Sequence, residues 1–243
     1  MNDKITVSEY LQIREDVATF LEEKRKNEVS EFDKLKDERH KKVVLDNAKL
    51  VYNKSKLIEP SISIDLNNLL NRVGGEFKSF NHRLKDLESL KRKIIADSKE
   101  YNGSYLRAAH NICDGVRYTI VFDDLEYVSK VDKFLSDLED LGYLVVDFKN
   151  NWGKPFYQGF NVRICHPNGD DIFELQFHTP YGYQIKEGST RDLYQVVRDS
   201  DTSSEVIELK KKANKLRKIF QQSVKVPVNA LEYGFNHKAK SRR

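Results

Sequence analysis

The feature that most constrains the fold of this chain is a pair of alternating polar and apolar stretches joined by a turn sequence. The first stretch covers residues 156–164, the second ends with residues 174–179, and Asn168-Gly169-Asp170-Asp171 lies between them. Alternation with a period of two is typical of β-strands that bury one face, and Asn-Gly favours a tight reversal of the chain. The sequence therefore predicts an antiparallel hairpin.

Polar groups share one face of the second predicted strand. Glu174, Gln176 and His178 project together, whereas Leu175 and Phe177 point the other way into the core. A carboxylate, an amide and an imidazole side by side are typical of an active-site surface. An ordinary hairpin with a solvated outer face has the same alternation, so the pattern alone leaves both interpretations open.

The first predicted strand adds a second polar row to the hairpin. Tyr157, Gly159, Asn161 and Arg163 alternate with other residues and share one face. Gly159 has no side chain, which leaves room for a flat ligand to approach the backbone.

Composition excludes several classes of protein. The chain has 243 residues, of which 39% are hydrophobic and 33% charged, and no apolar stretch approaches the roughly 20 residues that span a bilayer. No Sec-type signal is visible at the N-terminus. Cys113 and Cys165 lie in apolar segments without metal-ligand spacing, which predicts buried thiols. We expect a globular protein with a cytoplasmic site of action and no membrane partner, with delivery as an effector left open.

Helical and strand patterns alternate along the chain and predict an α+β fold, with a mixed sheet of about four or five strands flanked by helices. Residues 6–56 predict two helices or one bent helix, Glu59-Pro60-Ser61 breaks the pattern, and residues 64–73 restart it. The other expected helices cover 83–97, 124–141, 181–199 and 203–223, and strands are expected at 116–122 and 142–148.

The hinge at Gly74-Gly75 divides the predicted chain into parts. We expect a helical N-terminal extension over residues 1–74, which packs without chemistry of its own. A catalytic domain follows over residues 75–225. Residues 226–243 form a basic C-terminal tail, and we expect its last part, His237–Arg243, to be disordered.

Basic residues gather in three places, although the net charge is only +4. The clusters are Lys78–Lys99, Lys210–Lys218 and His237–Arg243. A helix with cations near its start favours phosphate groups, because free N-terminal amides and cationic side chains both attract anions. Lysine runs on helices are also ordinary solvated faces, so the clusters alone do not decide between a nucleotide and a nucleic acid.

A further acid lies where the chain enters its first core strand. The segment Asn111-Ile-Cys-Asp114-Gly-Val-Arg117 allows Asp114 and Glu174 to face each other across neighbouring strands. Two carboxylates beside Lys and Arg suit a Mg²⁺-nucleotide, because Mg²⁺ takes one or two carboxylates together with phosphate oxygens. The alternative is that Asp114 caps a helix and pairs with Arg117.

Motifs in a fixed order resemble the synthetase domain of the RelA/SpoT family. They are Arg83-Leu-Lys85 with Ser89, Lys91 and Lys93; Asp114-Gly-Val-Arg117-Tyr-Thr-Ile; Tyr157-Gln-Gly159-Phe-Asn161; and Glu174-Leu-Gln176-Phe-His178-Thr. The resemblance covers residues 76–200, whereas residues 1–74 carry no recognisable motif. Lys186 and Leu193-Tyr194, which follow the last motif, resemble the toxin-like branch of that family.

The resemblance implies a nucleotide pyrophosphokinase, which transfers the β,γ-pyrophosphate of ATP to a ribose hydroxyl of an acceptor nucleotide and releases AMP. It implies Mg²⁺ as the cofactor, with Asp114 and Glu174 as metal ligands and Glu174, Asp114 and Gln176 as catalytic residues. The implied ligands of ATP and its phosphates are Arg83, Lys85, Ser89, Lys91, Lys93 and Arg117. The implied acceptor-binding residues are Tyr157, Asn161, His178 and Lys186. Such chemistry needs positioning and charge neutralisation more than a covalent nucleophile.

Departures from the family pattern modify these expectations. Asn161 stands where guanine-using synthetases have histidine, which favours an adenine nucleotide over GDP or GTP as acceptor. Arg191 stands where the toxin-like branch often has histidine. No hydrolase motif precedes the domain, so we hypothesise a toxin or delivered effector with an immunity protein or antitoxin as partner. The terminal ribose of tRNA as acceptor, and a non-catalytic nucleotide-binding or interaction module, stay open as alternatives.

Overall fold

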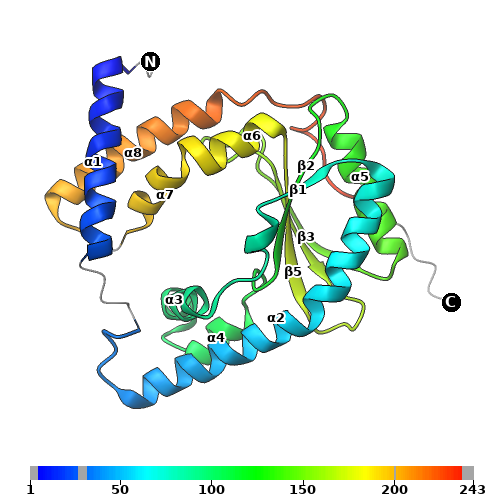
Figure 1. Cartoon of the computed structure of the whole chain (residues 1–243), viewed down its shortest axis with the longest axis horizontal. Helices are drawn as coiled ribbons and strands as arrows, with labels where there is room; N and C mark the ends of the chain where they lie inside the picture. The colour runs from blue at the N-terminus through cyan, green and yellow to red at the C-terminus, as the bar shows by residue number, and fades with distance from the viewer. Residues whose placement is uncertain (1–4, 27–31, 200, 237–243) are drawn as a thin grey trace.

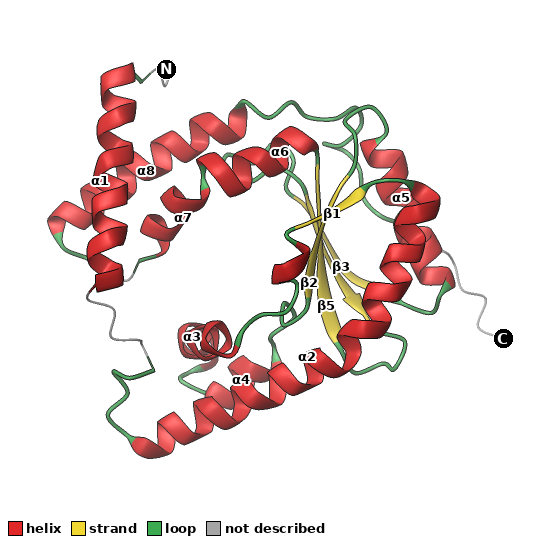
Figure 2. Cartoon of the chain, in the orientation of Figure 1, coloured by secondary structure: helices red, strands yellow, loops and turns green. Residues whose placement is uncertain are grey.

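The computed structural model describes residues 5–26, 32–199 and 201–236. It contains a five-stranded sheet in the order β1-β2-β5-β4-β3 (Figures 1 and 2). Strands β2 and β5 are parallel, and the other neighbouring pairs are antiparallel. The predicted α+β class with a mixed sheet is confirmed. The strands are β1 (Glu76–Lys78), β2 (Arg117–Val121), β3 (Leu144–Asn150), β4 (Phe160–Cys165) and β5 (Ile172–His178).

The predicted hairpin is confirmed, but its first strand is shorter than predicted. β4 and β5 pair antiparallel from Phe160 opposite Phe177 to Cys165 opposite Ile172. The residues before Phe160 form a turn, because the Gln158 side chain accepts a hydrogen bond from the Gly153 amide and donates one to the Lys154 carbonyl. Tyr157 therefore precedes the strand and is not part of its alternating face.

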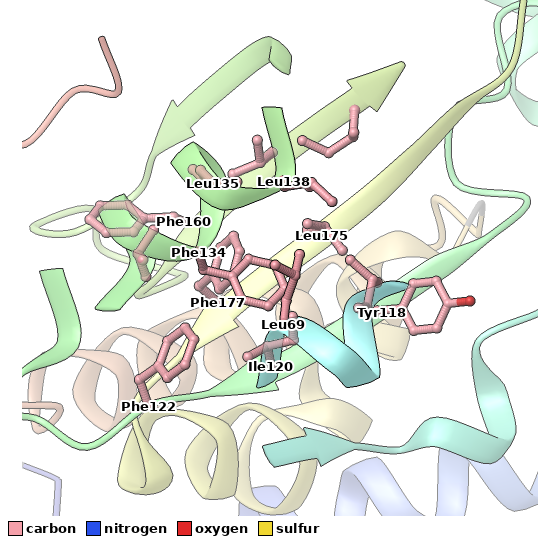
Figure 3. Close-up of a cluster of buried hydrophobic side chains, with 14 of the residues drawn as sticks. Leu69, Tyr118, Ile120, Phe122, Phe134, Leu135, Leu138, Phe160, Leu175 and Phe177 are labelled. Atoms are coloured by element: carbon pink, nitrogen blue, oxygen red, sulfur yellow. The ribbon is translucent and has the colours of Figure 1, made fainter. Parts of the chain in front are cut away.

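The hydrophobic core lies between one face of the sheet and two helices, α2 (Glu38–Val73) and α5 (Tyr127–Asp140). Figure 3 shows Leu69 of α2 and Phe134, Leu135 and Leu138 of α5 against apolar side chains of the sheet. Burial of each such side chain contributes roughly 1.5–3 kcal/mol. The sheet side chains labelled there are Tyr118, Ile120, Phe160, Leu175 and Phe177. The opposite face of the sheet carries the polar residues.

Helix α2 continues through Pro60, so the predicted break at residues 59–61 and restart at residues 64–73 are wrong. Proline removes one hydrogen bond from a helix interior and costs ~3 kcal/mol there. Burial outweighs this cost, because Ile58, Ile62 and Leu66, on both sides of the proline, pack into the main core. The second half of α2 therefore shares a core with the sheet, and the domain boundary near residue 74 stays a prediction.

The other helices flank the polar face of the sheet. Figure 2 shows α3 and α4 on one side of this face and α6 and α7 on the other. α1 packs on α7 and α8 through an apolar cluster that includes Val17 and Leu193. No helix among the described residues is both long and apolar enough to cross a bilayer. These helices are α1 (Val7–Lys26), α3 (Leu87–Ser98), α4 (Tyr105–His110), α6 (Pro180–Gln184), α7 (Arg191–Arg198) and α8 (Ser204–Gln222).

Two helices near the polar face differ from their predicted bounds. The helix predicted from residue 83 begins at Leu87, because the Asp86 side chain accepts a hydrogen bond from the Ser89 amide at 2.7 Å and caps it there. Arg83 and Lys85 thus lie before the helix. The helix predicted over residues 181–199 is interrupted between α6 and α7 by a π-helical turn, η3 (Ile185–Ser189).

The described part of the C-terminal segment, as far as residue 236, packs against the sheet, whereas the predicted disorder concerns residues outside the described part. The Asn150 side chain in β3 donates hydrogen bonds to the carbonyls of Ala230, Leu231 and Tyr233. The Tyr233 ring also packs edge-on against Phe148. The basic residues at 237–243 lie outside the described residues.

Candidate active site

The register of the strands places the polar side chains in two rows across one face of the sheet. The rows follow from the pairing of β2 with β5, β5 with β4, and β4 with β3. One row is Arg117, Glu174, Arg163 and Asp147, and the other is Thr119, Gln176, Asn161 and Lys149. Glu174 therefore lies between an arginine on each neighbouring strand.

Residues 83–85 run beside the start of β2 and bring cations to Asp114. The Arg117 amide donates to the Arg83 carbonyl at 2.8 Å, and the Lys85 amide donates to the Gly115 carbonyl at 3.0 Å. This pairing places Lys85 Nζ 3.0 Å from Asp114 Oδ2. Lys93 Nζ, from α3, lies 3.8 Å from Asp114 Oδ1.

The structure tests the alternative in which Asp114 caps a helix and forms an ion pair with Arg117. Asp114 lies between α4 and β2 and caps none of the described helices. Its ion pairs are with Lys85 and Lys93, and Arg117 acts on it only as a neighbouring charge. The capping alternative is therefore wrong, and the expected partner Arg117 is replaced by two lysines.

Asp114 and Glu174 are a carboxylate pair with opposite electrostatic environments. Burial opposes ionisation of Asp114, but Lys85 and Lys93 outweigh it and lower the pKa of that carboxyl group. Burial, followed by the negative charge of Asp114, raises the pKa of Glu174. The charge of Asp114 thus acts on Glu174, and the joint role of the two carboxylates in binding a magnesium ion stays a prediction.

One oxygen of this pair can serve as a ligand for a cation. Asp114 Oδ1 is buried and accepts no hydrogen bond. A buried polar atom without a partner is costly, and a metal ion would satisfy it. Among the described residues no three His, Cys, Asp or Glu side chains come together as a metal site. Two carboxylates with phosphate oxygens are nevertheless a sufficient ligand set for Mg²⁺, so the residues fit this ion.

A chain of hydrogen bonds orients Glu174. Gln176 Nε2 donates to Glu174 Oε1 at 2.6 Å, and Lys186 Nζ donates to Gln176 Oε1 at 3.0 Å. Burial lowers the pKa of the Lys186 ammonium group, and its ion pair with Glu187 opposes this shift. Because a lysine can only donate, it fixes which end of the Gln176 amide faces Glu174.

His178 holds Tyr157 rather than projecting freely. Burial lowers the pKa of His178, so its imidazole is neutral. Its Nδ1 donates to the Gln158 carbonyl at 2.9 Å, which leaves Nε2 to accept from the Tyr157 hydroxyl at 2.8 Å. Gly159 makes this contact possible, because a Cβ at its position would lie 2.9 Å from His178 Nδ1. Asn161 Oδ1 is also buried without a hydrogen-bond partner.

Three of the predicted phosphate ligands make other contacts. Arg83 Nε bonds to Glu59 of α2, and its guanidinium lies 4.2 Å from the centre of the Phe80 ring. Ser89 bonds to Asp86 through both its amide and its hydroxyl. The third, Lys91, is buried, with its ammonium group over the Phe32 ring and in an ion pair with Glu88. Their proposed phosphate contacts stay predictions.

Some residues near the site were not singled out from the sequence. Thr119 lies in one of the polar rows, and simple extension of the alternation from Arg117 would have found it. No alternation or motif in the sequence marks Glu59 or Glu187 as residues near the site. Glu59 lies in a helix assigned to the N-terminal extension, and its partner Arg83 is distant in sequence.

Fold and site together define an α+β protein with a carboxylate pair, set among lysines and arginines, on the polar face of a mixed sheet. No protein-family model matches the chain, and no curated protein matches it.

Among solved structures, the chain is similar to small alarmone synthetase 2 from Bacillus subtilis, with 16% identity, a TM-score of 0.44, and coverage of 73% of this chain and 94% of the other. It is similar to small alarmone synthetase 1 from the same organism, bound to its product pppGpp, with 10% identity, a TM-score of 0.40, and coverage of 76% and 95%. A GTP pyrophosphokinase family protein from Streptococcus pneumoniae matches with 14% identity, a TM-score of 0.39, and coverage of 67% and 84%.

Proposed function

We propose that this chain transfers the β,γ-pyrophosphate of ATP to the ribose 3′-hydroxyl of a nucleotide, with AMP as the leaving group. The observation that carries the proposal is the Asp114–Glu174 pair. The charge of Asp114 raises the pKa of Glu174, one buried oxygen of Asp114 accepts no hydrogen bond, and Lys85 and Lys93 form ion pairs with Asp114. This arrangement suits a Mg²⁺-bound chain of phosphates.

The residues of the site then divide by charge. Lys85, Lys93 and Arg117 bind and neutralise the donor phosphates, which is the main requirement of phosphoryl-type transfer. Asp114 and Glu174 would hold Mg²⁺. When bound, this ion supplies neutralisation of phosphate charge and acidifies a nearby hydroxyl group.

Glu174 is the proposed base for the acceptor hydroxyl. Burial and Asp114 raise its pKa toward the neutral range, where a carboxylate accepts a proton more readily. Gln176 keeps one oxygen of Glu174 occupied through a hydrogen bond at 2.6 Å. The other oxygen of Glu174 is left for the hydroxyl or the metal ion.

The acceptor base is proposed to lie between Tyr157 and Asn161, and we propose adenine as that base. Tyr157 is held in place by His178, so its ring is preorganised. The unpartnered Asn161 Oδ1 can accept a hydrogen bond from an amino group, which both adenine and guanine carry, so the choice of adenine rests on Asn161 standing where guanine-using synthetases have histidine. Lys186 lies close enough to Gln176 to border the same region.

Incubation of the full chain with ATP, Mg²⁺ and one acceptor at a time tests this proposal. The acceptors are AMP, ADP, GDP, GTP and deacylated tRNA, and anion-exchange chromatography separates the products. We expect AMP together with a 3′-pyrophosphorylated adenine nucleotide, for which ATP itself can also serve as acceptor, and no pyrophosphorylated GDP or GTP. Transfer to tRNA alone would replace the nucleotide acceptor, and the absence of AMP with every acceptor would support a non-catalytic module.

We also propose that the product makes the protein a toxin or delivered effector, because unopposed synthesis consumes ATP. Induced expression in bacteria should arrest growth, whereas a Glu174→Gln variant at equal abundance should not. Arrest by both variants would show that toxicity does not arise from this reaction. A protein that protects cells from the arrest would be the proposed immunity partner.

A further inference from the structure

The π-helical turn η3 determines the position of Lys186. A π turn inserts one extra residue into a helix and so rotates the side chains that follow by about 100° relative to a continuous α-helix. Lys186 is the second residue of η3 (Ile185–Ser189), and its ammonium group reaches Gln176 on the sheet. Such turns are rare and occur often at functional sites.

Two buried polar side chains stabilise this turn. The Thr190 hydroxyl donates to the carbonyls of Ile185 and Lys186, at 3.1 and 3.3 Å. Gln221 of α8 donates from Nε2 to the same hydroxyl at 3.3 Å. Thr190 and Gln221 are only 4% and 2% exposed, so water does not compete for these hydrogen bonds.

A path of hydrogen bonds, joined by the backbone and side chain of Lys186, therefore runs from α8 to Glu174. It passes from Gln221 to Thr190, through the backbone of η3 to Lys186, and on to Gln176 and Glu174. A lysine side chain is flexible and carries about 2 kcal/mol of rotamer entropy, so its ammonium group stays in one place only when its backbone is fixed.

We propose that Gln221 and Thr190 are positioning residues, which act through η3 and Lys186 to set the Gln176 amide that orients Glu174. The inference rests on the proposed function, because Glu174 is the base in that reaction. A purely structural role predicts lower stability with no specific change at Gln176. The positioning role predicts a change at Gln176 in a protein that stays folded.

Matched variants separate the two roles. Gln221→Met keeps the length of the side chain and removes the hydrogen bond, whereas Gln222→Met makes the same change at the exposed neighbouring residue. Thr190→Val removes the hydroxyl, and Thr190→Ser retains it. The first readout is the side-chain amide resonance of Gln176 in protein labelled with ¹⁵N at glutamine, assigned with a Gln176→Glu variant.

We expect Gln221→Met and Thr190→Val to shift the Gln176 amide resonance, while Gln222→Met and Thr190→Ser leave it unchanged. The second readout is turnover. Gln221→Met should lower kcat roughly tenfold, about 1.4 kcal/mol, with little change in KM for ATP. Combination with Lys186→Met should add no further loss beyond that of Lys186→Met alone.

The two readouts distinguish the inference from the proposed function. An unchanged Gln176 resonance in Gln221→Met protein would overturn the inference, even if the wild type is active. A shifted resonance in a protein that never releases AMP would support the hydrogen-bonded path and reject the proposed reaction. Equal loss of kcat in Gln221→Met and Gln222→Met would also overturn the positioning role of Gln221.

Discussion

Replacement of Glu59 by glutamine should destabilise the whole protein, because this residue joins α2 to the segment that borders the site. Glu59 is 6% exposed and accepts hydrogen bonds from Arg83 Nε, the Ser63 hydroxyl and the Tyr118 hydroxyl. Burial alone would raise the pKa of Glu59, but the hydrogen bonds from Arg83 and Ser63 outweigh it and lower that pKa. The native fold therefore favours the charged carboxylate.

The expected size of the effect follows from this geometry. Removal of one partner from a fully buried ion pair costs roughly 3–5 kcal/mol. The Arg83 side chain is 26% exposed, and glutamine still accepts some of the hydrogen bonds, which reduces the expected cost to about 2 kcal/mol. For a chain of this length that loss lowers Tm by about 4–8 °C.

Thermal unfolding of the wild type, Glu59→Gln and Asp46→Asn as an exposed control on α2 measures this difference. The direction in which the stabilising effect of Glu59 changes with pH also follows from its lowered pKa. Because the pKa of Glu59 is lower in the folded state, its stabilising effect is full above the ordinary value of about 4.5 and disappears as pH falls through the folded pKa. The reasoning is refuted if Glu59→Gln melts within 1 °C of the control at pH 7, or if the gap does not narrow in acid.

Four further predictions concern the site itself. Gly159→Ala should lower Tm by several degrees in calorimetry, because Gly159 has φ of +143° and an added Cβ would lie 2.5 Å from the Phe177 carbonyl oxygen; an unchanged Tm would contradict the tight contact. Asp114→Asn should lower the pKa of Glu174 in a ¹³C NMR titration, because the charge of Asp114 raises it. AMP release by the wild type should fall as pH decreases through this raised pKa, because protonated Glu174 cannot act as the base. Asn161→His should shift the acceptor preference toward guanine nucleotides, measured as the ratio of products from mixed ADP and GDP, and a constant ratio would remove Asn161 from base selection.

The parts of the fold that follow from local pattern were predictable from the sequence. The alternation around Glu174 and Gln176 predicted β5, its polar face and its hairpin with β4, and helical spacing predicted α5. These patterns report directly on burial, which determines both the strand faces and the buried side of an amphipathic helix.

The parts that depend on tertiary contacts were not predictable in this way. Pro60 reads as a helix breaker, and only the burial of Ile58 and Ile62 shows why α2 continues through it. Arg83 reads as a phosphate ligand, but its contact with Glu59 requires knowledge of where α2 lies. The π turn before Thr190 depends on a hydrogen bond from a helix distant in sequence.

The most direct test of the proposed reaction is the stoichiometry of its products. In the presence of Mg²⁺, ATP and an adenine nucleotide, the wild type should form AMP and a 3′-pyrophosphorylated nucleotide in equal amounts, as measured by chromatography and ³¹P NMR. Glu174→Gln should form neither, whereas Glu208→Gln, which changes an exposed glutamate on α8, should match the wild type. Full turnover by Glu174→Gln, or release of ADP and phosphate in place of AMP, would contradict the account.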